Sequence, residues 1–141
     1  MNMDDLDILL KEKNDIQSII KATCFINNIT PQQFATKSRE RYLIDARRMA
    51  YSAIKDICNF GWSRIGKEFN MDHASIIHHY KQHSNLLLMD RFYSEKYEAL
   101  IEVAKSEIGI IDVKDILEEV RRRKLEFSKA KMKIKNHLDN L

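Results

Sequence analysis

The sequence has few of the residues that interrupt helices: it contains three glycines and one proline in 141 residues. Glycine and proline are common at the tight turns of sheet-rich folds, so their scarcity argues against a sandwich or a barrel. With 44% hydrophobic and 32% charged residues, the composition predicts an all-α protein with short connections. At this length we expect one domain, or one domain with an appendage.

Long apolar runs are also absent. None approaches the ~20 residues that a membrane-spanning helix needs, and the acidic start, MNMDDLD, lacks the basic region of a signal peptide. We therefore expect a cytoplasmic protein with no membrane partner. Two cysteines, Cys24 and Cys58, each lie among apolar neighbours, which predicts free thiols rather than a disulfide framework.

The basic excess is concentrated in the middle of the chain. Residues 1–29 carry three Lys against five Asp or Glu, and residues 84–141 carry twelve Lys or Arg against eleven. Residues 30–83 carry nine Lys or Arg against five acidic residues. Such a segment suits an anionic partner or an ordinary solvated surface, and charge alone does not distinguish the two.

Helical periodicity appears in three places before residue 60. Residues 3–24 predict one amphipathic helix, or two with a break near Asn14. In ITPQQF, Thr30 is the predicted N-cap of a short helix, and Gln33 completes a capping box. Residues 41–58 predict a long surface helix. The predicted solvent side of this helix carries Arg41, Asp45, Arg48, Ser52, Lys55 and Asp56.

A pair of shorter helices follows a break at residues 59–61. WSRIGKEF, residues 62–69, predicts a short helix, and Asp72 is a suitable N-cap for the next one, HASIIHHYKQH. That second helix has a small polar outer face opposite its apolar residues. A short helix, a tight turn and a second helix of this kind have the outline of a helix-turn-helix.

The rest of the chain predicts a helical extension, so we place a boundary between residues 1–83 and 84–141. Residues 88–107 predict one helix. A last helix carries apolar residues seven positions apart: Val113, Val120, Phe127, Ile134 and Leu141. This heptad spacing fits a helix that packs on the domain or one that forms a coiled coil, through which a homodimer or a protein partner would bind.

Histidines are concentrated in and beside the second helix of the motif: they are His73, His78, His79 and His83. Two of these, at i, i+4 spacing, could share a metal ion. However, no carboxylate or thiol has matching spacing and the HExxH pattern is absent, so we predict no metal site and no cofactor. Solvated or capping histidines are the simpler interpretation.

Basic side chains gather just ahead of the motif, in TKSRERYLIDARR, residues 36–48. The basic residues of this loop and of the helix after it are Lys37, Arg39, Arg41, Arg47, Arg48 and Lys55. Such side chains can hold phosphates, and an arginine on a flexible approach can enter a minor groove. A hydrated charged surface is the alternative for each residue taken alone.

The order of these features resembles the C-terminal DNA-binding domain of the bacterial chromosomal replication initiator DnaA. The likeness covers residues 14–83 and is carried by TKSRER, DARRMA, WSRIGKEF and DHASIIHH. The last run is similar to the family's Asp-His-Thr/Ser-Thr-Val-Leu-His. The resemblance implies a helix-turn-helix fold that binds double-stranded DNA.

The resemblance also implies roles for individual residues. Arg39 matches the arginine that enters the minor groove in this family, with Lys37 and Arg41 beside it at the DNA backbone. The start of the recognition helix, which reads base edges in the major groove, corresponds to Asp72, His73, Ala74 and Ser75, with His78 expected on the same face. Phosphate-contact positions correspond to Arg47, Lys55 and Ser63, with Arg48 expected beside them.

Two departures from the family pattern affect the expected reading of DNA. The loop before Asp72 is one residue shorter than the family's Gly-Gly-Arg, and Met71 stands where the arginine would be, so one contact is missing. Ala74 replaces a threonine, which removes a hydroxyl but can keep contact with a thymine methyl group. The preferred DNA sequence can therefore differ from the initiator's own.

We expect a sequence-specific DNA-binding protein without catalytic activity, located at the nucleoid or on phage DNA. An accessory or regulatory role in replication or transcription is expected, with a phage or mobile element among the candidate sources. The GxxxxGK[ST] loop is absent, and the length leaves no room for the initiator's ATPase module. The alternatives are an interaction protein that binds or blocks a partner through its helical tail, and a metal-dependent nuclease, which would need a carboxylate cluster.

Overall fold

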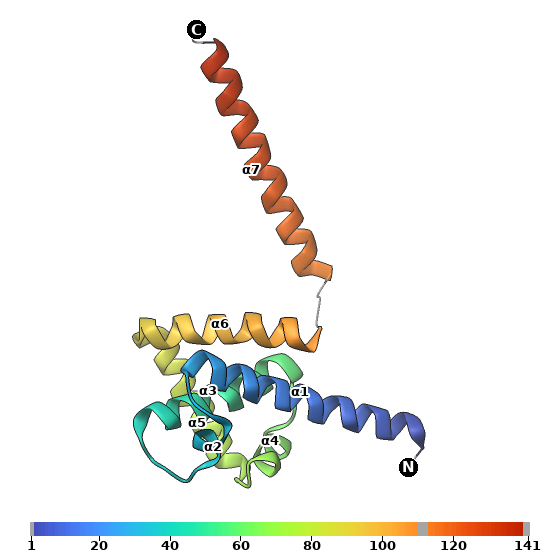
Figure 1. Ribbon diagram of the computed structural model, residues 1–141, viewed down its shortest axis with the longest axis vertical. Helices are drawn as coiled ribbons and strands as arrows, with labels where there is room; N and C mark the ends of the chain where they lie inside the picture. The colour runs from blue at the N-terminus through green and yellow to red at the C-terminus, as the bar shows by residue number, and fades with distance from the viewer. Residues whose placement is uncertain (1, 110–112, 140–141) are drawn as a thin grey trace. The chain divides into compact units, whose positions relative to one another are not determined.

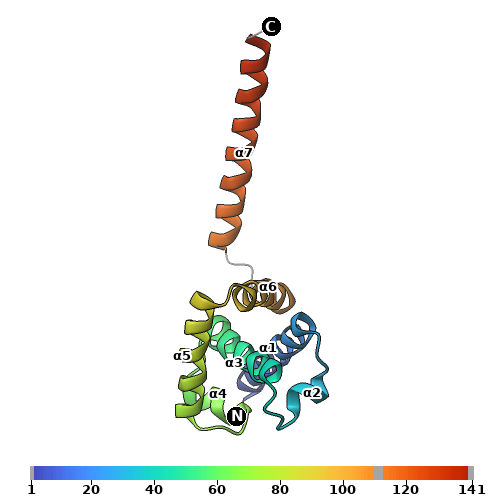
Figure 2. The same ribbon diagram turned by 90° about the vertical axis from the view of Figure 1, so that its left-hand side faces the viewer.

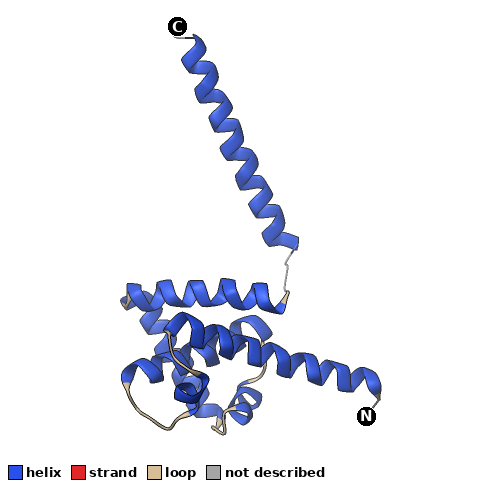
Figure 3. Ribbon diagram, viewed as in Figure 1, coloured by secondary structure: helices blue, strands red, loops and turns tan. Residues whose placement is uncertain are grey.

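The computed structural model describes residues 2–109 and 113–139, and every regular element in these ranges is a helix (Figure 3). The helices are α1 (Met3–Asn27), α2 (Pro31–Ala35), α3 (Arg41–Cys58), α4 (Trp62–Glu68), α5 (His73–Met89), α6 (Arg91–Ile108) and α7 (Val113–Asp139). The all-α prediction is confirmed. Asp90, between α5 and α6, accepts a hydrogen bond from the backbone N–H of Tyr93 at 3.1 Å, and so caps the start of α6.

The chain forms two compact units, residues 1–108 and 109–141. This division differs from the boundary expected at residue 84, because α5 continues through that position to Met89 and α6 packs on the first unit. Gly109 has a φ of 74°, a left-handed conformation that ends α6. Leu141, the last heptad residue, lies outside the described residues.

The first helix is continuous, so the alternative of a break near Asn14 is wrong. It ends at Asn28, whose φ of 53° lets the backbone N–H of Ile29 reach the Cys24 carbonyl oxygen at 3.0 Å. Ile29 is buried beside this turn. The turn therefore directs the chain from α1 into α2.

The capping box at α2 is confirmed. The Gln33 backbone N–H donates to Thr30 Oγ1 at 3.1 Å, and the Thr30 N–H donates to Gln33 Oε1 at 2.8 Å. Phe34 is buried on the opposite side of α2. A short helix is held here by local hydrogen bonds and by one aromatic side chain in the core.

The central helix, α3, buries more of its surface than its sequence pattern predicts. Ser52, expected on the solvent side, is fully buried, and the side chain of Arg48 is only 14% exposed. The reason is that α3 contacts helices on several sides: α1, α5 and α6 surround it (Figures 1 and 2). One core cluster joins α1, α3, α4, α5 and α6, and a second joins the end of α1 to α2 and α3.

Polar side-chain contacts join α6 to α3 and α5. Asp56 of α3 accepts hydrogen bonds from Tyr80 of α5 at 2.7 Å and from Tyr97 of α6 at 2.5 Å. His83, 1% exposed, lies 2.6 Å from the Tyr93 hydroxyl through its Nδ1 atom. These contacts require defined geometry, and the one at His83 is buried, so they fix α6 specifically rather than by apolar contact alone.

Both cysteines are free thiols, as predicted, and burial raises the pKa of each. The helices that the structure describes include none with the length and apolar character of a membrane span. In α7, the apolar side chains from Leu117 to Leu138 are exposed. The heptad pattern of α7 therefore leaves a stripe of apolar side chains exposed to solvent.

Candidate nucleic-acid interface

The turn between α4 and α5 is built by three consecutive residues, beginning with Phe69. Asn70 has a φ of 54°, and the Met71 backbone N–H donates to the Gly66 carbonyl oxygen at 2.8 Å. A Cβ atom on Gly66 would collide with the Met71 carbonyl oxygen, so only glycine allows this close approach. The helix-turn-helix predicted from the sequence is present, and its turn has one tightly defined conformation.

Asp72 caps α5, as predicted. Its Oδ1 atom accepts a hydrogen bond from the Ser75 backbone N–H at 2.7 Å, and this bond lowers the pKa of the Asp72 carboxyl group. His73 and Ala74 are exposed beside it, and Ser75 is half-buried. The first turn of α5 thus presents small and polar groups to solvent, which a base edge in a groove could approach.

The outer face of α5 continues from this first turn. Ala74, His78 and Lys81 follow one another at i, i+4 and i+7, and all three are exposed. Ile76, by contrast, is 1% exposed and faces the core. The helix therefore keeps one face free over about two turns, because its apolar residues are confined to the other.

The loop between α2 and α3 is organised by one arginine. From α3, the Arg47 guanidinium donates hydrogen bonds to the carbonyl oxygens of Phe34 at 2.9 Å, Ser38 at 2.6 Å and Thr36. Its Nη2 atom also donates to Thr36 Oγ1 at 3.2 Å. The planar guanidinium can satisfy several carbonyls at once, which fixes the backbone of this loop.

Lys37 and Arg39 lie on the loop that Arg47 holds. Both are exposed, and neither makes a hydrogen bond or an ion pair within residues 2–109 and 113–139. Arg41 begins α3 with a side chain that is 82% exposed and lies 3.8 Å from Asp45. An exposed pair at this distance is weak, so Arg41 remains open to exchange this partner for a phosphate.

Two other basic residues of α3 are engaged inside the domain. Arg48 Nε donates to His79 Nδ1 at 3.3 Å, and its Nη1 atom contacts Asp45 at 3.4 Å. Burial, and next the Arg48 charge, lower the pKa of His79, so a neutral imidazole accepts this bond. Lys55 Nζ donates to the Phe60 carbonyl oxygen at 3.1 Å and lies 4.5 Å from the centroid of the Trp62 ring.

These contacts divide the predicted site residues into two groups. Arg47, Arg48 and Lys55 each bind another part of the chain, so in the free protein they position α2, α5 and the α3–α4 connection. The other candidates are exposed, except Ser75, which is half-buried. They are Lys37, Arg39, Arg41, Ser63, Asp72, His73, Ala74, Ser75 and His78. That any of them contacts DNA stays a prediction.

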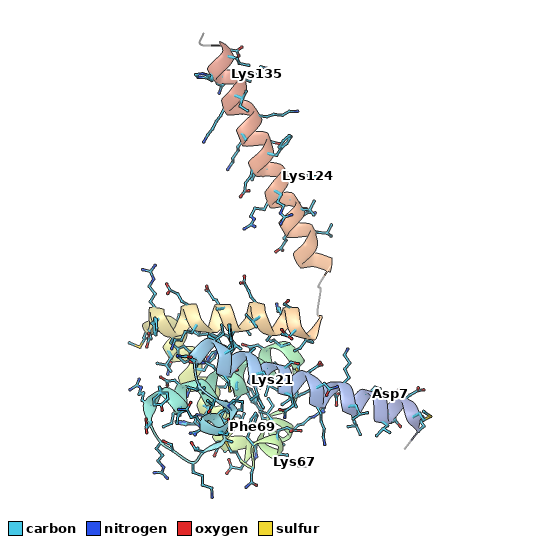
Figure 4. The ribbon with its side chains drawn as sticks, in the orientation of Figure 1. Asp7, Lys21, Lys67, Phe69, Lys124 and Lys135 are labelled. Atoms are coloured by element: carbon cyan, nitrogen blue, oxygen red, sulfur yellow. The ribbon has the colours of Figure 1, made fainter. Side chains whose placement is uncertain are left out.

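The two solvent-facing segments lie at the same end of the first unit. Both the loop at residues 36–40 and the turn before α5 are at the end away from α6, in two perpendicular views (Figures 1 and 2). Lys67, labelled at this end in Figure 4, is exposed in the last turn of α4. The geometry therefore places the loop that carries Arg39 and the start of α5 on one side of the domain.

Sequence reasoning missed two cations on this side. Lys67 was not proposed, although it follows Gly66 on the solvent face of α4, and Lys81 was not proposed, although it is three residues from His78. Helical spacing from residues already selected would have found Lys81. For Lys67 the signal is weaker, because its position beside the turn is set by tertiary structure.

The histidines of α5 have separate environments. His83 is buried against Tyr93 and Tyr97, His79 faces Arg48 and Tyr51, and His78 is exposed. Within the part of the chain that the structure describes, no group of three or more His, Cys, Asp or Glu side chains is arranged to hold a metal ion. The buried histidines instead pack and bond to neighbouring helices.

Comparison with known proteins identifies relatives of this arrangement. The family described as bacterial dnaA protein helix-turn-helix matches residues 16–82, which include the C-terminal part of α1, all of α2 to α4 and the first part of α5. The chromosomal replication initiator protein DnaA of Bacteroides thetaiotaomicron is 30% identical over 91 residues, which are 64% of this chain and 19% of that protein. The matched region thus contains both solvent-facing segments.

Two other relatives are also chromosomal replication initiator proteins DnaA. The protein of Nautilia profundicola is 31% identical over 101 residues, covering 69% of this chain and 23% of the relative. That of Thermoanaerobacter sp. strain X514 is 27% identical over 85 residues, covering 60% and 19%. The chain spans about a fifth of the length of the curated relatives it matches.

Proposed function

Residues 16–82 of this chain belong to the bacterial DnaA helix-turn-helix family, and from this we propose that the chain binds double-stranded DNA in a sequence-specific manner. The exposed loop at residues 36–40 contacts one groove, and the start of α5 contacts the next. The observation that carries this proposal is the Arg47 guanidinium, which holds the loop so that Lys37 and Arg39 point to solvent. A loop fixed in this way loses less entropy on binding.

Affinity and specificity come from different side chains. Lys37, Arg41 and Lys67 are exposed cations that suit phosphate oxygens, and such contacts make binding strongly dependent on salt. Arg39 is assigned to the minor groove and His73 to base edges in the major groove, because these are the positions that the family uses. His73 is exposed at the first turn of α5 and can donate or accept a hydrogen bond there.

The DNA sequence preferred by this chain is proposed to differ from that of the initiator. Met71 is half-buried and packs against the main core cluster, so it cannot replace the arginine expected at that position. Ala74 is exposed but has no hydroxyl group. One polar contact is lost at each position, and a methyl contact to thymine remains available to Ala74.

The role proposed for the chain is accessory or regulatory, in replication or transcription. Its support is the match to a DNA-binding domain. Binding alone can act at a DNA site by recruiting or excluding other proteins. A phage or mobile element remains among the candidate sources.

Selection from a pool of random duplexes tests the function directly. The chain is incubated with the pool at low and at moderate salt, and the bound fraction is sequenced. We expect an enriched motif, and we expect Arg39→Ala and His73→Ala each to lose ~1–3 kcal/mol of binding to it. Equal losses on scrambled DNA would remove the reading roles of these residues, and no binding at low salt would refute the proposal.

A second candidate function is protein binding through the helical extension. Val120, Phe127 and Ile134 of α7 are 43%, 65% and 63% exposed, although they are spaced for helix pairing. A large exposed apolar stripe on a helix is typical of an interaction surface. This function does not exclude DNA binding by the first unit, because the two use separate residues.

A further inference from the structure

The N-terminal end of α1 extends beyond the helices that pack around it. Residues 3–11 are all exposed, whereas Ile16 and Ile19 of the same helix are 2% and 0% exposed (Figures 1 and 3). We call residues 3–11 the α1 extension. Its large apolar side chains, 41% to 81% exposed, are Met3, Leu6, Ile8, Leu9 and Leu10.

The α1 extension is also acidic. It holds three carboxylates, Asp4, Asp5 and Asp7, against one lysine, Lys11. Carboxylates in a first helical turn suit the helix dipole, which accounts for the two that lie there. The dipole gives no reason for five large apolar residues in nine positions, so we conclude that another surface covers them.

The second unit has a surface of opposite charge. Residues 121–135 of α7, RRRKLEFSKAKMKIK, carry eight basic side chains against one carboxylate. We call them the basic segment. Phe127, Met132 and Ile134 are 65%, 68% and 63% exposed within it, and Figure 4 labels two of its lysines, Lys124 and Lys135. The basic segment therefore presents apolar and cationic groups together.

Pairing of two basic segments is unfavourable. Lys124 and Lys131 lie three or four residues from Phe127 on the same helical face, so parallel or antiparallel pairing would bring lysines together at the apolar seam. Each copy would add eight basic side chains to one short contact. A partner that is both apolar and acidic avoids this repulsion.

DNA would match the cations of the basic segment and leave its apolar side chains unused. A phosphate backbone is contacted by Lys and Arg, whereas Phe127 and Ile134 would stay in water. A helix with leucines and carboxylates satisfies both kinds of group, since apolar side chains contact one another and lysines pair at the rim. The α1 extension has this composition.

We propose that the basic segment of one copy docks on the α1 extension of a second copy of this chain. The extension of nine residues is about 14 Å long, and the basic segment of fifteen residues is about 22 Å long, so the shorter surface fits within the longer. Asp4, Asp5 and Asp7 face lysines and arginines, and Leu6 and Leu10 contact Phe127 and Ile134. The contact does not depend on DNA binding.

Sedimentation velocity of the full chain, without DNA, tests the docking. Samples from about 5 to about 500 µM are compared in about 50 mM and about 500 mM NaCl, where screening lengths differ severalfold. The average mass is expected to rise with concentration in low salt, and the dissociation constant to weaken about tenfold in high salt. A constant monomer mass at every concentration overturns the proposal, as does association that salt leaves unchanged.

Charge reversal on both sides identifies the two surfaces. Asp4→Lys, Asp5→Lys and Asp7→Lys together make the α1 extension basic, and Lys→Glu at 129, 131, 133 and 135 leaves the basic segment with four cations and five carboxylates. Each set alone is expected to abolish association. Both sets in one chain are expected to restore it, because the signs are again opposite. Failure of the double set to associate overturns the pairing.

Further variants separate docking from loss of structure. The Asp substitutions change the first turn of α1, so a second variant, Leu6→Gln with Leu10→Gln, keeps every charge and is expected to weaken association about tenfold or more. Circular dichroism checks that helix content is kept. The matched control reverses three exposed carboxylates of α6, Glu95, Glu98 and Glu102, and should associate like the parent.

DNA is the other ligand that could occupy the basic segment. Self-association and the salt dependence of DNA binding, both measured in the variant with four Lys→Glu substitutions, distinguish the two. If the four Lys→Glu substitutions reduce the salt dependence of DNA binding while self-association stays as in the parent, the basic segment contacts DNA and the docking proposal is wrong. If self-association is lost and the DNA salt dependence is kept, the docking stands, whether or not the first unit reads a DNA sequence.

Discussion

Acid is expected to destabilise the first unit through His83, the buried imidazole that joins α5 to α6. Its Nδ1 atom lies 2.6 Å from the Tyr93 hydroxyl, and its Nε2 atom has no hydrogen-bond partner among the described residues. Burial lowers the pKa of His83 to about 4 from 6.5, with a further contribution from the Arg48 charge, while the Asp56 carboxylate opposes the shift. Protonation would place an N–H without an acceptor in the core.

The sign and size of the effect follow from proton binding in the two states. Below pH 6.5 the unfolded chain binds a proton at this imidazole, and the folded chain does not until about pH 4, so stability falls as pH falls through this window. One pKa unit corresponds to about 1.4 kcal/mol, so the loss between pH 7 and pH 5 is about 2 kcal/mol. His79, whose pKa is also lowered, contributes in the same direction.

Urea unfolding followed by circular dichroism at pH 7 and pH 5 measures this loss. In His83→Asn, the amide can still bond the Tyr93 hydroxyl but cannot titrate. The variant should be less stable at pH 7, because a smaller side chain leaves a cavity, yet its stability should depend on pH by about 2 kcal/mol less than that of the parent. His137→Asn, which removes an exposed imidazole of α7, is the control. An unchanged pH dependence in His83→Asn would refute the reasoning.

Three further predictions concern the helix-turn-helix. Arg47→Ala should lose ~1–3 kcal/mol of DNA binding and little more when Arg39→Ala is added. Arg47→Lys should not rescue it, because the three donors of an ammonium share one nitrogen and cannot reproduce the planar fork that reaches three separate carbonyls. Rescue by Lys in an anisotropy titration would indicate a direct phosphate contact. Gly66→Ala should destabilise by ~1–3 kcal/mol in urea, while Gly61→Ala, whose Cβ meets nothing within 4 Å, should be near neutral. Thr30→Ala should cost about 1 kcal/mol in the same assay, and no change would show that the capping box is dispensable.

Much of the fold could be predicted because its signals are local. The Thr30 capping box, the Asp72 cap and the limits of α3 depend on residues within a few positions, and the structure has each of them where the sequence predicts it. Hydrogen bonds at helix ends form between near neighbours, so their residue types reveal them. The helix-turn-helix could be predicted from the sequence for the same reason.

What could not be predicted depends on distant residues. Ser52 looks like a solvent-side residue of α3, but it is fully buried, because α6 packs on α3 in addition to α1 and α5. His83 looks like a surface or metal-binding histidine until Tyr93 and Tyr97 are placed against it. In both cases the missing information is the packing of α6, whose own sequence shows that it is amphipathic but not which helices it contacts.

The division of the basic residues of α3 has a consequence for how the site is held together. Three successive contacts run from this one helix: Arg47 to the loop before it, Arg48 to α5 and Lys55 to the connection before α4. The two solvent-facing segments do not have to touch each other, because α3 holds both of them. Their spacing is then set by a buried helix with fixed side-chain geometry, rather than by the exposed segments themselves. If the first unit binds DNA as proposed, an arginine that is held inside the domain determines whether two grooves are contacted at once, which is why Arg39→Ala and Arg47→Ala should show little additional effect in combination.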